Sequence, residues 1–154
     1  MRIGVHGLVF TGVFDEAGVR TAVEGASAVG FDLLELPLME PETFNGKAAK
    51  RILDDSPLSV TASLGLQADT DISSTDPKAV SAGRSVLLKC LDHLVDMGGT
   101  DLCGVIYSAM RKYDAPASPE GISNSQGVIS EIAEEATARG ISVSLEVVNR
   151  YETN

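Results

Sequence analysis

The segment 141–152 combines a strand pattern with side chains that could act as acids, bases or metal ligands. Residues 141–148 alternate Ser with Val and Leu, and Glu146 stands among apolar neighbours within this run, which predicts a buried strand. A buried carboxylate without a partner is costly or stays protonated. We therefore expect a metal ion, a cationic group or hydrogen-bond donors beside Glu146, and a plain salt bridge to Arg150 or Arg2 is the alternative.

Other polar side chains stand at the ends of further strand-like runs. They are His6, Glu35, Ser63 and Tyr107. In parallel α/β proteins the functional groups gather at the carboxyl ends of the strands, so we expect these side chains to lie on the same side as Glu146. Residues 7–12 lack both glycine-rich phosphate-binding patterns, which disfavours a nucleotide site after the first strand.

Two cysteines and a second histidine fall outside these strand ends. Cys90 and Cys103 lie in a predicted helix and a predicted strand without CxxC spacing, which predicts buried free thiols rather than a disulfide or a metal site. His93 is expected on the exposed side of its helix and without a function.

Strand-like and helix-like segments alternate regularly along the chain. Short apolar runs predict strands, and apolar residues at helical spacing followed by glycine predict helices. Pro41, Pro77 and Pro119 stand at the first turn of three expected helices, a position that proline favours. The expected strands are 2–9, 31–37, 58–66, 101–107 and 141–148, and the expected helices are 14–29, 41–53, 77–97 and 119–139.

Five strands separated by four helices form consecutive βα units, which pack as a parallel sheet with right-handed crossovers. Two α/β architectures fit this order: the first five strands and four helices of a TIM-barrel-like fold, or an open flavodoxin-like five-stranded sheet. A TIM barrel has eight strands and typically about 250 residues, so 154 residues would form an incomplete barrel. In either case we expect residues 1–154 to form one domain.

Charge and hydropathy restrict the partners and the location of the protein. A formal net charge of -10 repels phosphate backbones and anionic lipid headgroups, so neither nucleic acid nor a membrane surface is an expected partner. No apolar stretch approaches the roughly 20 residues of a membrane span, and no signal-peptide pattern precedes the first strand. We therefore expect a cytoplasmic protein.

The residues 145–152, Leu-Glu-Val-Val-Asn-Arg-Tyr-Glu, are similar to the strand-five signature of a known family, in which Asn-Arg-aromatic-Glu follows a catalytic glutamate. The family comprises the D-tagatose 3-epimerases and D-allulose (D-psicose) 3-epimerases of the xylose-isomerase-like TIM barrel superfamily. The segments 2–6, 30–35 and 65–83 resemble it as well. The resemblance extends over the whole chain, and it covers the amino-terminal part of the family's barrel.

The resemblance implies metal-dependent C3 epimerisation of free ketoses through an enediolate, with Mn²⁺ or Co²⁺ as the divalent cation. It implies that Glu146 is a catalytic acid/base and also a metal ligand. Glu152 matches the glutamate that binds substrate hydroxyls, and His6, Ser63 and Val105 match positions that shape the sugar pocket.

The family's second catalytic glutamate, together with an Asp and a His of its metal site, has no counterpart in this chain. We therefore expect the chain alone to be inactive, and to form a homo-oligomer or to bind a complementary chain that completes the barrel. Two other functions stay open. One is another sugar isomerase or dehydratase of the same superfamily, and the other is a non-catalytic carbohydrate-binding remnant.

Overall fold

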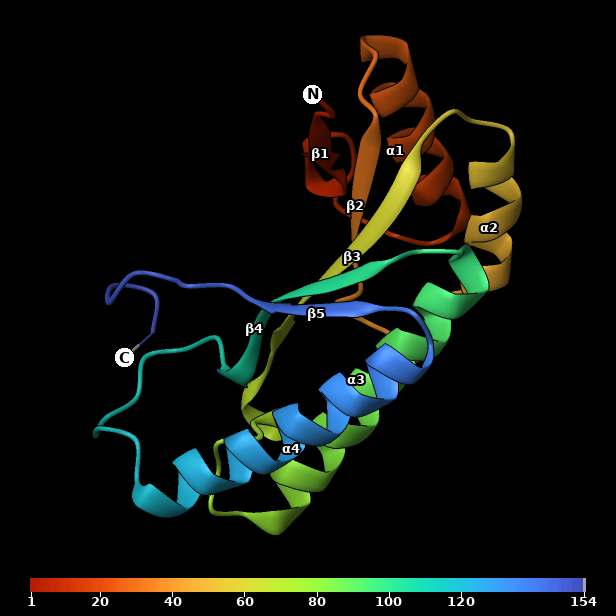
Figure 1. The fold of residues 1–154 in the computed structure, drawn as a ribbon. Coiled ribbons are helices and arrows are strands. Elements are labelled where there is room, and N and C mark those ends of the chain that lie inside the picture. Colours follow the sequence, from red (N-terminus) through yellow and green to blue (C-terminus); the bar gives the residue numbers. More distant parts are fainter. Residues whose placement is uncertain (154) are drawn as a thin grey trace.

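The computed structural model describes residues 1–153, in which five strands alternate with four α-helices (Figure 1). The predicted succession of βα units is therefore confirmed. The strands are β1 (Gly4–His6), β2 (Leu33–Pro37), β3 (Ser59–Leu66), β4 (Asp101–Ala109) and β5 (Ser142–Leu145). The helices are α1 (Glu16–Val29), α2 (Gly46–Asp54), α3 (Pro77–Met97) and α4 (Pro119–Ala138), with short 3-10 helices η1 (Gly7–Val9) and η2 (Ala68–Thr70).

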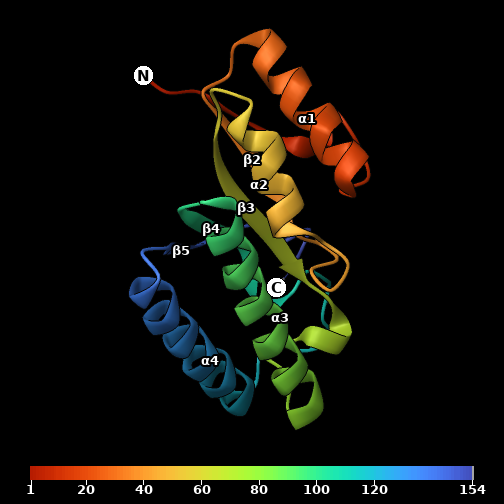
Figure 2. The same ribbon diagram turned by 90° about the vertical axis from the view of Figure 1, so that its right-hand side faces the viewer.

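The sheet has the sequential order β1-β2-β3-β4-β5, and every neighbouring pair is parallel. All four α-helices lie on the same side of it, as the two perpendicular views show (Figures 1 and 2). A flavodoxin-like sheet reverses its strand order at a switch point and has helices on both faces. The flavodoxin-like alternative is therefore wrong, and the sequential order is that of successive strands of a barrel.

The hydrophobic core lies between the helices and one face of the sheet. Its largest fully buried side chains include Leu34, Leu36, Leu66, Leu102 and Ile106 from the strands and Leu87, Leu91, Leu94 and Ile132 from the helices. Because successive strand residues point to opposite faces, the residues between these leucines point away from the helices. We call this second surface of the sheet the open face.

The first strand is shorter than predicted. The sequence predicted a strand over residues 2–9, but β1 ends at His6 and the chain turns through η1. The Nδ1 atom of His6 accepts a hydrogen bond from the backbone amide of Leu8 at 3.2 Å. This local bond stabilises the turn, and the strand pattern in the sequence does not reveal it.

The second helix begins later than predicted, and this change also buries His93. Asn45 caps α2, while Pro41 lies before the helix and its carbonyl oxygen accepts a hydrogen bond from Nε2 of His93 at 2.7 Å. The ring of Phe44 packs edge-on against the imidazole, with 5.2 Å between the centroids. The prediction that His93 is exposed is therefore wrong, because the segment before α2 covers this side of α3.

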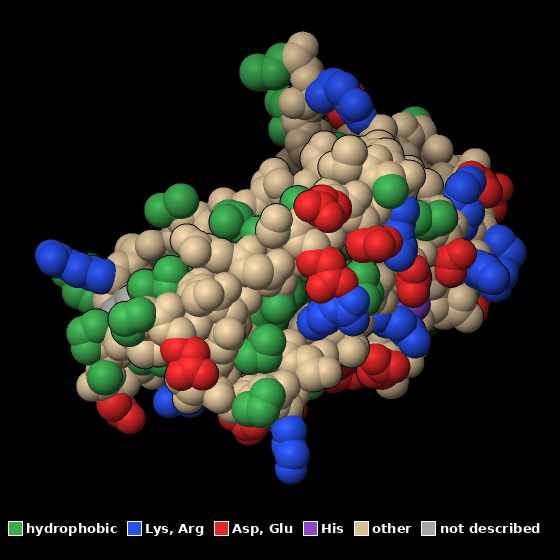
Figure 3. Space-filling model, turned by 60° about the horizontal axis from the view of Figure 1, so that its bottom comes forward, with side chains coloured by type: hydrophobic (Ala, Val, Ile, Leu, Met, Phe, Trp, Pro, Cys, Tyr) green, Lys and Arg blue, Asp and Glu red, His purple; other side chains and the backbone are tan. Residues whose placement is uncertain are grey.

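Charged side chains of both signs lie interspersed on the surface that Figure 3 shows, which is the lower side of Figure 1 turned forward. Arg84 of α3 pairs with Glu131 of α4, and Arg139 at the end of α4 pairs with Asp92 of α3. These ion pairs join the outer surfaces of the two helices. Within residues 1–153, no helix has the length and apolar character that a membrane span requires.

Candidate active site

Each of the five strands brings a polar side chain to the carboxyl end of the open face. These residues are His6, Glu35, Ser63, Cys103 and Glu146, the last of which directly follows β5. The sheet register places His6 beside Glu35 and Ser63 beside Cys103. Because core residues flank Glu35 and Ser63 in sequence, the alternation of the strands turns these two side chains away from the helices. Four of these residues, His6, Glu35, Ser63 and Glu146, are strand ends that the sequence predicted to carry polar groups. The fifth predicted residue, Tyr107, lines the cavity between the loops that follow β3 and β4.

His6, Glu35 and Ser63 form the centre of this cluster. The Nε2 atom of His6 lies 3.2 Å from Oγ of Ser63 and 3.5 Å from Oε1 of Glu35. The side chains of His6 and Glu35 are 35% and 30% exposed, respectively. They are thus half-buried, and a ligand on the open face could still reach them. Of the predicted sugar-binding residues, the structure brings His6 and Ser63 into direct contact.

Cys103 extends the cluster towards β5. Its Sγ lies 3.5 Å from Oε2 of Glu35, to which the thiol donates. Burial raises the pKa of Cys103 to about 12, with further contributions from the negative charges of Glu35, Glu146 and Asp101. The thiol is therefore neutral at physiological pH and acts as a hydrogen-bond donor rather than as a nucleophile.

Both cysteines are free thiols, as predicted. Cys90 is completely buried in the core, and burial raises its pKa to about 12. The sequence did not single out Cys103 as a member of the cluster. Its position next to the core residue Leu102 in β4 could have indicated that it points to the open face.

Glu146 lies at the end of β5, and its side chain is exposed rather than buried as predicted. Its backbone amide donates to the carbonyl oxygen of Gly104 at 3.0 Å, so the residue still belongs to the β4–β5 ladder. The exposure follows from the sheet order, because within residues 1–153 β5 pairs only with β4 and is an edge strand. The negative charge of this carboxylate contributes to the raised pKa of Cys103.

The residues after Glu146 form a turn rather than a continuation of the strand. Asn149 donates from its side chain to the carboxylate of Glu152 and accepts from the amide of Tyr151. Lys112 of the β4–α4 loop donates to the carbonyl oxygens of Arg150 and Thr153. Glu152 is exposed within this turn, and the turn is held against the β4–α4 loop.

Val105 differs from the other predicted pocket residues because its side chain is only 2% exposed. It follows Gly104, whose φ of +127° is accessible mainly to glycine. A Cβ at Gly104 would lie 2.1 Å from the carbonyl oxygen of Leu64. The close approach of β3 and β4 at this point therefore requires glycine.

No group of three or more His, Cys, Asp or Glu side chains that could hold a metal ion occurs within residues 1–153. Glu146 can supply a carboxylate ligand, but a divalent cation with oxygen and nitrogen ligands requires several. The described residues thus do not form a complete Mn²⁺ or Co²⁺ site by themselves.

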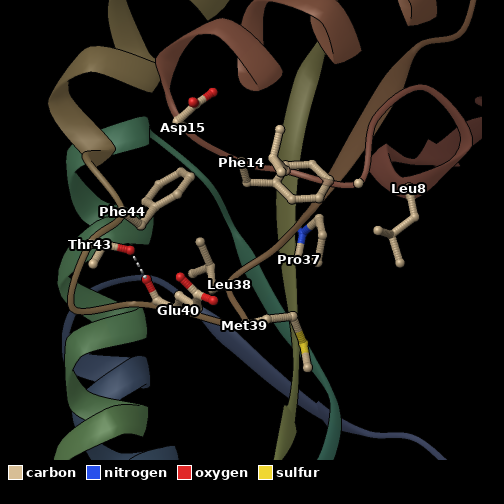
Figure 4. A pocket seen from close by; sticks show the side chains of 11 residues that line it. Leu8, Phe14, Asp15, Pro37, Leu38, Met39, Glu40, Thr43 and Phe44 are labelled. Atoms are coloured by element: carbon tan, nitrogen blue, oxygen red, sulfur yellow. Dashed lines mark hydrogen bonds between the residues drawn. The ribbon is translucent and has the colours of Figure 1, made fainter.

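A cavity of about 380 Å³ opens between the β1–α1 and β2–α2 loops (Figure 4). Its walls are mainly apolar and include Leu8, Phe14, Pro37 and Met39. Asp15 at its edge is already engaged, because it accepts a hydrogen bond from the first turn of α1. This cavity could hold an apolar group, whereas the cluster on the open face has the groups that proton transfer requires.

A larger cavity, of about 690 Å³, lies between the loops that follow β3 and β4. Asp71, which is only 6% exposed, forms part of its wall and joins the two loops. Its carboxylate accepts from the amide and hydroxyl of Ser73, the amide of Ala109 and the hydroxyl of Tyr113. The sequence did not single out Asp71. The spacing Asp-x-Ser at residues 71–73, which is typical of a local turn, could have indicated it.

Known proteins resemble this chain over its whole length. It is 51% identical to a ketose 3-epimerase from Arthrobacter globiformis over 154 residues, which are 100% of this chain and 53% of that protein. It is 44% identical to an L-ribulose 3-epimerase from Methylomonas sp., again over 100% of the chain and 54% of the relative. No family model matches the chain.

A solved structure supports the same relationship. The crystal structure of D-allulose 3-epimerase from Methylomonas sp. in complex with D-allulose matches with a TM-score of 0.96 and 44% identity. The match covers 100% of this chain and 54% of that one. This chain thus spans about half the length of the relatives that it matches.

The sequential parallel sheet and the cluster on its open face therefore define an α/β fold shared with TIM-barrel epimerases over about half of their length. Homologues named ketose 3-epimerase, L-ribulose 3-epimerase and D-allulose 3-epimerase cover the whole chain. The family resemblance seen in the sequence is confirmed.

Proposed function

We propose that this chain is the part of a ketose 3-epimerase that carries one of its two catalytic glutamates, Glu146. The 51% identity to a ketose 3-epimerase over all 154 residues carries the proposal. The cluster on the open face supports it, because His6 and Ser63 offer hydrogen-bond partners for sugar hydroxyls. D-Allulose and L-ribulose, which the names of its relatives mention, are the first substrates to test.

In this proposal Glu146 transfers a proton at C3 of the ketose. Removal of a proton next to a carbonyl gives an enediolate, and return of a proton to the opposite face inverts the centre. Inversion therefore requires a second base on the other side of the sugar. Glu152 is proposed to bind substrate hydroxyls, and His6, Ser63 and Val105 to shape the sugar pocket.

Glu146 is also proposed as one ligand of a divalent cation, Mn²⁺ or Co²⁺. The exposed position of its carboxylate at the end of β5 supports this role, because it leaves the oxygens accessible to an ion. The remaining ligands and the second base would come from residues outside these 154. We therefore propose that the 154 residues alone do not epimerise ketoses.

Two assays test these roles. The purified chain with Mn²⁺ and D-fructose, D-tagatose or D-allulose is expected to give no turnover, and turnover above a metal-only control would refute its inactivity.

In the second assay the chain is mixed with a polypeptide comprising the part of the Arthrobacter globiformis ketose 3-epimerase that it does not match. Epimerisation is expected with the wild-type chain and with the surface control Glu24→Gln, but not with Glu146→Gln. Equal rates for all three mixtures would exclude Glu146 as the catalytic base.

We further propose that a second polypeptide covers the open face and pairs with the edge strands. In the part of the chain that the structure describes, β1 pairs only with β2 and β5 only with β4, so each has an edge that could accept another strand. Ile3, Leu145 and Val147 are 51%, 49% and 95% exposed beside these edges. The partner is a second copy or a complementary chain that completes the barrel. Sedimentation that finds a monomer at micromolar concentration would count against self-association.

A cytoplasmic location stays a prediction. The two free thiols support it, because reducing compartments preserve unpaired cysteines. Cell fractionation with an antibody against the chain would test it.

A further inference from the structure

Glu35 lies at the centre of the cluster on the open face, although the strand-five motif assigns it no role. One carboxylate oxygen lies 3.5 Å from Nε2 of His6. The other accepts from the thiol of Cys103 at 3.5 Å. Glu35 therefore links the first strand of the sheet to the fourth, across the space that Ser63 borders.

The hydrogen bonds of His6 determine where its ring carries the proton. Nδ1 accepts from the backbone amide of Leu8 at 3.2 Å. A ring nitrogen that accepts a hydrogen bond carries no proton, so this contact favours the neutral tautomer with its proton on Nε2 but does not by itself fix it. This N–H group faces Oγ of Ser63 at 3.2 Å and the carboxylate of Glu35 at 3.5 Å.

The ring tautomer in turn determines what Ser63 can do. A hydroxyl group has one proton to donate and two lone pairs that accept. When His6 donates to Oγ of Ser63, the proton of the hydroxyl is left for a different acceptor. Because Ser63 lies on the open face, this acceptor can be an oxygen atom of a ligand bound there.

We propose that Glu35 is a positioning residue, which holds His6 as the Nε2–H tautomer so that Ser63 donates its hydroxyl proton to a sugar oxygen. The carboxylate does so electrostatically, since its negative charge favours the tautomer that directs N–H towards it. The proposal rests on the proposed function only where it names a sugar as the ligand. The tautomer of His6 can be measured without any sugar.

Nitrogen-15 NMR of the imidazole rings tests the positioning role. The chain has two histidines, so a long-range proton–nitrogen spectrum at pH 8 contains two ring systems. His93, whose Nε2 lies 2.7 Å from the carbonyl oxygen of Pro41, serves as an internal control. In the wild type His6 is expected to show a protonated Nε2 and an unprotonated Nδ1.

Four variants separate the contributions. In Glu35→Ala and in the bulkier Glu35→Leu, His6 is expected to show averaged shifts of two tautomers, while His93 is unchanged and reports that the fold is intact. Glu35→Gln keeps an acceptor oxygen and is expected to restore most of the Nε2–H form. Glu24→Ala, a change of an exposed glutamate on α1, should leave both rings unchanged.

A single Nε2–H tautomer of His6 in both Glu35→Ala and Glu35→Leu would overturn the proposal. Titration with D-allulose forms the second arm. The wild type is expected to bind the sugar about tenfold more tightly than Glu35→Ala, which corresponds to one hydrogen bond of about 1.4 kcal/mol. If the sugar fails to bind the wild type, that result counts against the proposed function, while the tautomer measurement still decides the role of Glu35.

Discussion

Replacement of Asp71 by alanine is expected to cost much of the stability of this chain, because the carboxylate joins the two loops that follow β3 and β4. It accepts from the amide and hydroxyl of Ser73 at 2.9 and 2.7 Å, from the hydroxyl of Tyr113 at 2.8 Å and from the amide of Ala109 at 3.2 Å. Ser73 is only half-buried and can bind water instead, and the amide of Ala109 keeps a second contact with Tyr113 at 2.9 Å. The hydroxyl of Tyr113 keeps a longer contact with the carbonyl oxygen of Ala109 at 3.3 Å. One hydrogen bond to a charged group is thus lost, so we expect a loss of about 1.5–3 kcal/mol.

Urea unfolding followed by circular dichroism would measure this loss. Asp114→Ala, a change of an exposed aspartate in the β4–α4 loop, is the matched control and should shift the free energy of unfolding by less than about 0.5 kcal/mol. A loss below about 1 kcal/mol for Asp71→Ala would refute the reasoning. A second readout is Tyr113, whose pKa is raised first by burial and also by the charge of Asp71. Its ultraviolet titration should move to lower pH in Asp71→Ala.

Three further predictions concern the two thiols, one half-buried and one buried, and a pair of glycines. Because the pKa of Cys103 is about 12, iodoacetamide should alkylate it about a thousandfold more slowly at pH 8 than a free cysteine. Glu35→Gln should speed the alkylation of Cys103. Equal rates in the wild type and in Glu35→Gln would contradict the role of Glu35. Burial also raises the pKa of Cys90 to about 12. Between about pH 9 and pH 12 the thiol therefore loses its proton in the unfolded state but keeps it in the folded state. The free energy of unfolding should fall in this range by up to about 1.4 kcal/mol per pH unit. Cys90→Ala should remove this part of the pH dependence, which chemical denaturation at several pH values would measure. Gly104→Ala, with its added Cβ only 2.1 Å from a backbone oxygen, should cost more than about 2 kcal/mol, whereas Gly127→Ala, on a helix with open space around it, should stabilise by about 0.5–1 kcal/mol.

The sequence alone was sufficient for the order of the elements. Apolar runs and helical spacing predicted every strand and helix of the βα succession, because local periodicity and caps such as Pro77 and Pro119 are written in neighbouring residues. The ends were less accurate where a polar side chain bonds to a nearby backbone amide, because hydrophobic periodicity does not reveal such a bond. η1 depends on the ring of His6, and the start of α2 depends on the Asn45 cap.

The choice between two architectures required tertiary structure. A list of βα units is compatible with both a doubly wound sheet and a barrel, since handedness and strand order depend on long-range pairing. The burial of Glu146 was mispredicted for the same reason. A strand pattern predicts alternation, but whether a strand has one neighbour or two depends on the sheet around it.

The sequence by itself thus determined the succession of elements, the free thiols and the family resemblance, all of which depend on residue type and spacing along the chain. Tertiary structure decided that the helices cover one face only, that His93 is buried, and that Glu35 contacts both His6 and Cys103. The physical reason is that these contacts join residues up to 68 positions apart. Sheet register, and not local preference, brings them together.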